Sequence, residues 1–214
     1  MTTIIIGAGA SGLACAIRLK QNNSDNEVIV LERLSTAGKK ILATGNGRCN
    51  LSNSSAAGCE KVLDFFSSLG LVTRTDEEGR IYPYSNQAVT VLDILLESCE
   101  KLGVEIITDC TVEAVDKDLT ITTSQGIFMA DKVVIACGGM AQEKLGSDGS
   151  GFKILKSLGH KITPLSPALV QLTSPSKYPR QLKGHRVKCN MSILLDNEVA
   201  DSEYGEVLFA DYGL

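Results

Sequence analysis

Three glycines near the N-terminus, Gly7, Gly9 and Gly12, have the spacing of a phosphate-binding turn. In such a turn the first glycine allows the tight bend, the second lets a pyrophosphate approach the backbone, and the third lets a helix pack closely on a strand. Glu32 follows the last glycine by twenty residues. Its carboxylate can accept hydrogen bonds from both hydroxyls of a ribose and would repel a 2′-phosphate. The pattern predicts a dinucleotide site that disfavours NADP; a purely structural glycine turn is the alternative.

A loop rich in glycine and asparagine, residues 38–53, is the second candidate binding segment. Such a loop can wrap a long, extended, anionic ligand, and Arg48 within it could pair with a pyrophosphate or with charge on a reduced flavin. Cys49, beside that arginine, is either a thiol of lowered pKa that faces the ligand or an inert buried thiol. For the whole loop, a solvated surface segment is the alternative.

Two further glycine-rich segments follow later in the chain. Cys137-Gly138-Gly139 comes directly after an expected strand, and ligands of open α/β sheets bind at the carboxyl ends of strands; an ordinary strand-to-loop turn is the alternative. Residues 146–151 precede an expected helix and are either a second helix N-terminus aimed at the ligand or a flexible capping loop.

The elements that position these motifs begin with a β-branched strand at residues 3–6, a helix up to residues 21–23 and a buried strand at residues 27–31. This order predicts a parallel βαβ unit. Residues 35–58 show no clean periodicity and are expected to be irregular. Further helices are expected at residues 59–69, 86–102 and 152–158, each ending in Leu-Gly, with Ser85 as the cap of the middle one.

The remaining segments are rich in strand-forming residues. An antiparallel meander is expected between two buried strands, one on each side of it in the sequence. After about residue 187 the pattern is again β-rich, with a turn at Asp196-Asn197. The expected strands cover residues 104–108, 111–115, 119–123, 127–130, 132–136, 188–195 and 206–210.

Composition excludes several classes of protein. The 214 residues carry 21 Lys and Arg against 25 Asp and Glu, a net charge of −4, which argues against broad electrostatic binding to nucleic acid or to an anionic membrane. Seven cysteines without a C-x-x-C pair argue against a disulfide scaffold, a Cys-pair zinc site and a dithiol redox site, and no metal site is predicted. The N-terminus lacks the basic region of a signal peptide, so a cytoplasmic location is expected.

Several ordered motifs together resemble one family, the flavoproteins that include aminoacetone-oxidase-like and bile-acid-pathway reductase-like enzymes. The resemblance spans nearly the whole chain and is much more specific than the first glycine motif alone. The motifs are GAGASGLACA at residues 7–16, GNGRCN at 45–50, GRIYPYSNQA at 79–88, IACGG at 135–139, GSDGSGF at 146–152, GHKITPLSPALVQL at 159–172 and LFADYGL at 208–214.

The resemblance implies FAD as the cofactor and an α/β fold, a Rossmann-like FAD-binding domain with a β-meander crossover. It implies that this domain covers residues 1–188 and that residues 189–214 begin a β-rich inserted substrate domain. It also implies cofactor contacts along the chain, with Glu32 on the adenosine ribose, Val112 meeting the adenine through its backbone and Gln87 near the flavin. The implied cofactor-binding residues are Gly7, Gly9, Gly12, Glu32, Lys40, Thr44, Gly47, Arg48, Cys49, Asn50, Gln87, Val112, Gly138 and Gly139.

Three functions are compatible with these motifs. The first is an FAD-dependent oxidoreductase, or the FAD-binding part of one, acting on a small molecule with NAD(P)H as a possible electron donor. The second is an NAD-linked dehydrogenase, and the third is a non-catalytic dinucleotide-binding module. Members of the resembled family are much longer than this chain, so the chain is expected to be a fragment of a longer protein or a truncated gene product. Self-association through exposed apolar strand edges is also expected. No residue is identified as catalytic.

Overall fold

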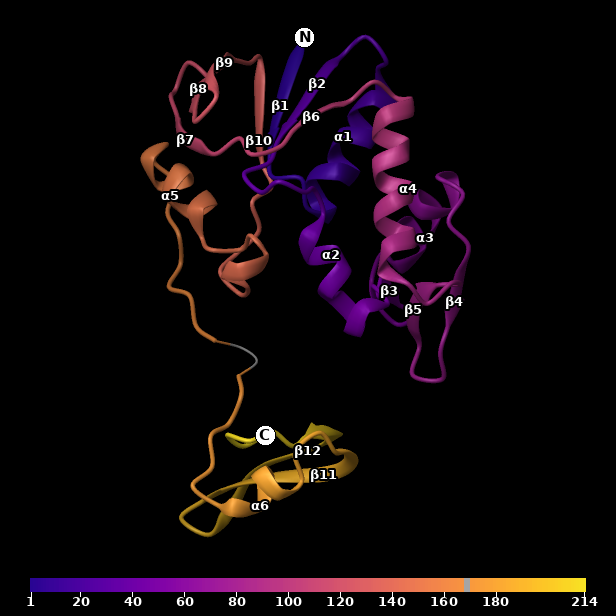
Figure 1. The fold of residues 1–214 in the computed structure, drawn as a ribbon, viewed down its shortest axis with the longest axis vertical. Coiled ribbons are helices and arrows are strands. Elements are labelled where there is room, and N and C mark those ends of the chain that lie inside the picture. The colour runs from indigo at the N-terminus through magenta and orange to yellow at the C-terminus, as the bar shows by residue number, and fades with distance from the viewer. Residues whose placement is uncertain (168–169) are drawn as a thin grey trace. The chain divides into compact units, whose positions relative to one another are not determined.

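A computed structural model describes residues 1–167 and 170–214 (Figure 1). The described chain forms two compact units, Met1–Ile162 and Thr163–Leu214. The boundary expected between residues 188 and 189 falls within the second unit, and the assignment of residues 189–214 to a substrate domain stays a prediction. Part of the GHKITPLSPALVQL motif, residues 168–169, lies outside the described residues.

A four-stranded parallel sheet forms the centre of the first unit, in the order β10-β1-β2-β6. Along β1, Ile4 and Ile6 face one side of the sheet and Ile5 faces the other, because successive side chains of a strand alternate. Both faces are therefore covered, which explains why these strands read as unbroken apolar runs. The strands are β1 (Thr2–Ile6), β2 (Glu27–Leu31), β6 (Glu105–Ile107) and β10 (Lys132–Ile135).

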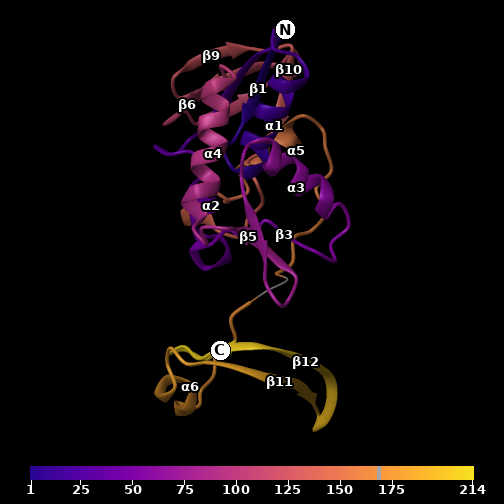
Figure 2. The ribbon, with the colours of Figure 1, turned by 90° about the vertical axis from the view of Figure 1, so that its right-hand side faces the viewer.

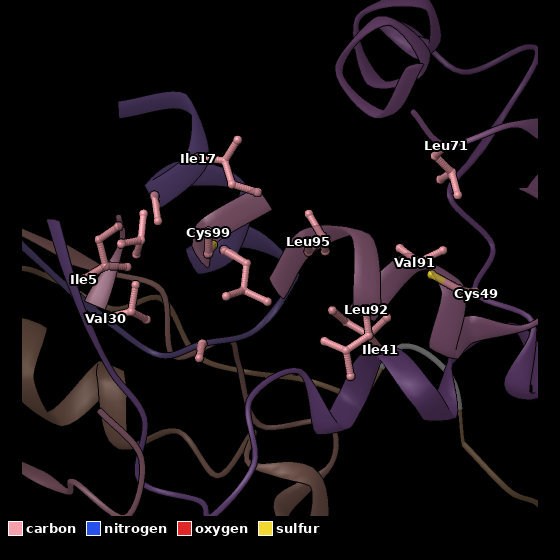
Figure 3. Close-up of a cluster of buried hydrophobic side chains, with 14 of the residues drawn as sticks. Ile5, Ile17, Val30, Ile41, Cys49, Leu71, Val91, Leu92, Leu95 and Cys99 are labelled. Atoms are coloured by element: carbon pink, nitrogen blue, oxygen red, sulfur yellow. The ribbon is translucent and has the colours of Figure 1, made fainter. Parts of the chain in front are cut away.

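Two helices, α1 (Ala10–Asn22) and α4 (Ala88–Lys101), cover one face of this sheet. Figure 3 shows the core that they share with the sheet, in which Ile5 and Val30 lie near Ile17 of α1 and Leu95 of α4. All four side chains are almost completely buried. The core thereby fixes where α1 begins relative to the carboxyl end of β1.

An antiparallel meander and one helix cover the other face (Figure 1). The meander has the order β7-β8-β9 and connects β6 to β10, so the predicted β-meander crossover is confirmed. Ile121 of the meander and Ile154 of the helix are buried beneath Ile4 and Ile6. These elements are β7 (Val112–Val115), β8 (Thr120–Thr123), β9 (Gly126–Met129) and α5 (Ser150–Ser157).

The segment expected to be irregular, residues 35–58, is partly helical. A five-residue helix, α2 (Lys39–Ala43), packs Ile41 into the core against Leu92 of α4, and a 3-10 turn, η1 (Thr44–Gly47), follows. One buried residue in five is too little for a helical period to appear in the sequence, so tertiary packing decides the structure here. After it come β3 (Ser52–Asn53), α3 (Cys59–Ser68), β4 (Thr73–Thr75) and β5 (Arg80–Pro83), with the sheet order β3-β5-β4.

The predicted helix ends are confirmed and one predicted cap is wrong. Helices α3, α4 and α5 each end at a leucine followed by a glycine of positive φ, namely Gly70, Gly103 and Gly159. Ser85 is not the N-cap of α4, because the helix begins after Gln87. Its hydroxyl instead accepts a hydrogen bond from the Gln87 N–H at 3.3 Å.

The second unit contains a short helix, α6 (Lys177–Gln181), and a long hairpin of β11 (Arg186–Leu195) and β12 (Glu198–Leu208). Figure 2 shows the two strands lying side by side along their length. The predicted turn at Asp196-Asn197 is confirmed, and both residues have the positive φ that a tight two-residue hairpin turn requires.

Candidate functional site

A cavity of about 300 Å³ opens where the strands of the first unit end. Its wall is built from the turn after β1, the end of β2, the start of β7, the segment after β10 and the loop before α5. These segments lie far apart in the sequence and meet because parallel strands share a carboxyl edge. The cavity therefore lies where an open α/β sheet binds its ligands.

The glycine turn and the N-terminus of α1 form the floor of the cavity. The helix begins after Gly9, which supplies no side chain to cap the first-turn N–H groups. A Cβ added at Gly9 would meet no atom within 4 Å, whereas one added at Gly12 would lie 1.9 Å from the Gly7 carbonyl oxygen. Gly9 thus leaves open space in front of a helix N-terminus, where the free N–H groups and the helix dipole favour an anion.

Glu32 lies at the cavity edge with both carboxylate oxygens fixed by backbone groups. One oxygen accepts a hydrogen bond from the Ala8 N–H at 2.8 Å and the other from the Leu34 N–H at 2.9 Å. Each oxygen keeps a further lone pair for a ligand hydroxyl. The two bonds hold the carboxylate rigidly at the predicted ribose position.

Lys40 places a positive charge in the cavity lining. Its Nζ donates a hydrogen bond to the Ser147 hydroxyl at 2.9 Å, and Ser147 is almost completely buried. No ion pair involves Lys40 in the part of the chain that the structure describes. A cation that is bonded to a neutral hydroxyl and faces a cavity favours an anionic ligand there.

Arg33 also lines the cavity, but its charge is already paired. Its guanidinium forms an ion pair with Asp148, which lies 115 residues away in the sequence, and about a quarter of each side chain is exposed. The other Asp148 oxygen accepts a hydrogen bond from the Ser150 N–H at 3.0 Å. Burial acts to raise the pKa of Asp148, but the bonds from Ser150 and Arg33 outweigh it and lower that pKa to about 2.

The lowered pKa of Asp148 predicts a pH-dependent contribution to stability. A carboxyl whose pKa is lower in the folded chain stabilises the fold fully above its ordinary value, and this contribution is lost as the pH falls through the folded value. We expect Asp148→Asn to reduce the free energy of unfolding by a constant amount above about pH 5, with the difference vanishing toward pH 2. Urea unfolding over this range checks the prediction.

Asp25→Asn is the control for that experiment, since Asp25 is exposed and forms no ion pair among the described residues. A difference between the wild type and Asp148→Asn that persists unchanged at pH 2 would contradict the assigned pairing.

The structure brings about half of the predicted binding residues to the cavity. Gly12 lies directly behind the wall, against the Gly7 carbonyl. Those that line the cavity are Gly7, Gly9, Glu32, Lys40, Val112 and Gly138. Those that do not are Gly12, Thr44, Gly47, Arg48, Cys49, Asn50, Gln87 and Gly139.

Arg48, in the GNGRCN loop, already has partners within the protein. Its guanidinium stacks on the Tyr82 ring at 4.4 Å from the ring centre, and it donates hydrogen bonds to the Gly45 carbonyl and the Tyr82 hydroxyl. Cys49 beside it is buried, and burial raises its pKa. The alternative of a thiol of lowered pKa is therefore wrong, and the inert buried thiol is the correct reading.

Sequence reasoning does not identify Arg33, Ser147 or Cys137 as individual parts of this wall, nor Asp148, which does not line the cavity but pairs with Arg33. Burial, followed by the nearby Glu32 charge, raises the pKa of Cys137 to about 11, and its thiol donates to the Ile6 carbonyl at 3.4 Å. Two segments of the sequence carry a signal: Cys137-Gly138-Gly139, expected at the ligand-binding edge of the sheet, and the GSDGSG segment, for which a helix N-terminus aimed at the ligand is one of two interpretations. The structure supports that interpretation, because Gly146, Ser147 and Ser150 line the cavity.

The described residues contain neither a cluster of metal ligands nor a membrane-spanning helix. No group of three or more His, Cys, Asp or Glu side chains among them is arranged to hold a metal ion. Within the same residues, no helix is both long enough and apolar enough to cross a membrane.

Comparison of the sequence with known proteins identifies a matching family. The profile described as "HI0933-like protein Rossmann domain" matches residues 1–60 and 56–184. The 3-dehydro-bile acid delta(4,6)-reductase of Clostridium scindens is 40% identical over a 233-residue alignment that covers 98% of this chain and 56% of that protein. The ribosomal RNA dihydrouridine synthase of Escherichia coli is 28% identical over 79% of this chain and 47% of its own length.

The chain thus spans about half the length of these curated relatives. Among solved structures, THI4 of Thermovibrio ammonificans superposes with a TM-score of 0.53 at 17% identity, covering 74% of this chain and 62% of that one. This likeness supports the fold.

Proposed function

Because the chain belongs to the HI0933-like family of FAD-binding Rossmann domains, we propose that it is the FAD-binding part of an oxidoreductase and that its cavity holds the ADP portion of FAD. The observation that carries the proposal is the division of charge along one wall. The open helix N-terminus and Lys40 favour an anion, whereas Glu32 offers acceptors for a diol. A pyrophosphate followed by a ribose has this order of groups.

The residues present fit this part of the cofactor. The open space in front of Gly9 leaves room for a phosphate close to the backbone. A volume of about 300 Å³ is at the lower end of ligand cavities, which suits the ADP portion better than the whole of FAD. FAD supplies the hydride-transfer chemistry, and the chain supplies binding, orientation and electrostatics.

For the remaining predicted contacts we propose a second zone of the same site. Thr44, Gly47, Arg48, Cys49, Asn50, Gln87 and Gly139 would lie along the flavin portion, beyond the cavity. Gln87 is the N-cap of α4, so its backbone N–H lies at a helix start. We also propose that residues 189–214 belong to a substrate domain.

The reaction that we propose is reduction of a small unsaturated organic molecule, with NADH or NADPH as the source of electrons. The reductase from Clostridium scindens, named for a dehydro-bile acid, supports a small-molecule substrate. The direct test is anaerobic: the FAD-loaded chain, reduced with dithionite, is mixed with a bile acid that carries a 3-oxo group and conjugated double bonds. Return of the oxidised flavin spectrum is expected.

A uridine oligonucleotide is the comparison substrate in that experiment, since the relative from Escherichia coli is named for dihydrouridine in ribosomal RNA. Reoxidation by the oligonucleotide alone would contradict the small-molecule proposal. The electron donor is tested separately: NADH or NADPH is added to the FAD-loaded chain, and loss of the oxidised flavin absorbance is measured.

Lys40 provides a quantitative test of the phosphate end. Lys40→Met removes the cation and keeps the apolar stem, so we expect FAD to bind about tenfold more weakly and with a weaker dependence on salt. Lys101→Met, which removes an exposed lysine at the far end of α4, is the control and should leave FAD affinity unchanged. Equal affinities of Lys40→Met and wild type would place the pyrophosphate elsewhere.

Two further properties are proposed for the chain. Its exposed apolar residues on the hairpin, which include Ile193, Leu194, Leu195 and Val199, favour self-association, for which light scattering is the measurement. A cytoplasmic location is proposed because all seven cysteines are free thiols, whereas oxidising compartments favour disulfides.

A further inference from the structure

We propose that Asp148 determines ribose specificity: by pairing with Arg33, the cavity-lining cation next to Glu32, it occupies the guanidinium that would otherwise accept a 2′-phosphate, so that this site excludes NADP(H). This inference rests on the proposed dinucleotide site and adds to it a residue outside the glycine motif. It also concerns binding specificity, which is measured independently of catalysis.

The first step is the position of Arg33. It follows Glu32 directly and lines the cavity. In dinucleotide sites of this type the acid contacts the ribose hydroxyl, and a nearby arginine is the usual partner of a 2′-phosphate. An unpaired Arg33 would therefore make this ribose end permissive for NADP.

The second step is the charge balance that Asp148 creates. The guanidinium is held by the Asp148 carboxylate, and Asp148 is itself fixed by the Ser150 N–H at the start of α5. Glu32 and Arg33 are neighbours in the cavity lining, and the Asp148 carboxylate contacts the Arg33 guanidinium, so the three charges lie close together beside the ribose end. Their sum is −1, which opposes a dianionic 2′-phosphate.

The third step is that the pairing persists under physiological conditions. The carboxyl of Asp148 stays ionised far below neutral pH, and both partners are largely shielded from water. The Arg33 guanidinium is already bound to a carboxylate. It must therefore break this ion pair before it can bind a phosphate. The specificity is thus built into the contact between the end of β2 and the loop before α5.

The experiment compares two probes that differ only in the 2′-phosphate, ADP-ribose and 2′-phospho-ADP-ribose, by calorimetric titration of the full chain. Wild type is expected to prefer ADP-ribose by about 30-fold or more, and Asp148→Asn to reduce that preference about tenfold. Asparagine keeps an acceptor for the Ser150 N–H, so the loop is expected to stay folded. A preference unchanged in Asp148→Asn would overturn the inference.

Two further variants identify the cause. Arg33→Gln combined with Asp148→Asn leaves the summed charge as in wild type and should restore the preference for ADP-ribose. A double variant that keeps the relaxed specificity would show that Arg33 is not the responsible group, which also overturns the inference. Asp76→Asn is the matched control, because Asp76 likewise accepts bonds from an arginine and from backbone N–H groups, but its arginine, Arg80, does not line the cavity.

The same titrations separate this inference from the proposed function. If wild type binds ADP-ribose and Asp148→Asn shows the same preference, the dinucleotide site stands and only the role of Asp148 fails. If wild type binds neither probe, the proposed cavity function fails and the inference fails with it.

Discussion

Gly9→Ala is expected to produce a folded chain that no longer retains FAD. The backbone of Gly9 has φ −81° and ψ −175°, which alanine adopts readily, and the added Cβ would meet no protein atom within 4 Å. The methyl group instead occupies the space in front of the α1 N-terminus where the pyrophosphate must approach. We expect FAD affinity to fall by about 100-fold or more, equivalent to about 2.7 kcal/mol.

Stability should change little in this variant. Alanine restricts the unfolded chain, but Gly9 is the N-cap of α1, a position that prefers glycine to alanine, so we expect the free energy of unfolding of the ligand-free chain to change by less than about 0.5 kcal/mol. Fluorescence titration with FAD and urea unfolding measure the two quantities. The control is Gly205→Ala: Gly205 has no positive φ, lies outside the cavity and is not among the predicted binding residues, and its added Cβ would meet only the flexible end of Met191, at 3.2 Å. Retention of wild-type FAD affinity in Gly9→Ala would contradict the assigned phosphate position.

Gly12→Ala is expected to damage the fold itself. A Cβ at this position would lie 1.9 Å from the carbonyl oxygen of Gly7, and both atoms belong to the backbone or are attached directly to it. No rotamer change relieves such a contact, so α1 must shift away from the end of β1. We expect a loss of about 3 kcal/mol of stability and a fall in Tm of about 10 °C.

The measurement is thermal unfolding of the ligand-free chain, which separates this variant from Gly9→Ala. The two substitutions add the same methyl group three residues apart, and only their surroundings differ. A Gly12→Ala chain as stable as wild type would show that the close packing of α1 on the glycine turn is not required for the fold.

The sequence predicts the parallel βαβ unit and the meander well, because residues close together in the sequence determine these elements. Strand, glycine turn, helix and second strand each have a pattern of their own, and the meander follows from short alternating segments joined by turn residues. The helix ends are equally local, since a glycine after the last leucine takes the positive φ that a C-cap requires.

The parts that the sequence could not predict depend on distant contacts. Helix α2 forms because Ile41 packs against Leu92, and no period reveals this in five residues. Arg48 stacks on Tyr82, 34 residues away, and no local pattern around Arg48 predicts this contact. The partners of Lys40 and Arg33 lie 107 and 115 residues away, in a loop whose sequence is compatible with two roles.

The most direct test of the central claim is the visible absorbance spectrum of the purified 214-residue chain after incubation with FAD and passage through a desalting column. The account predicts flavin bands that stay with the protein at close to one FAD per chain. A chain that emerges colourless, while binding NADH in a parallel fluorescence titration, would contradict the FAD site and favour the NAD-linked alternative.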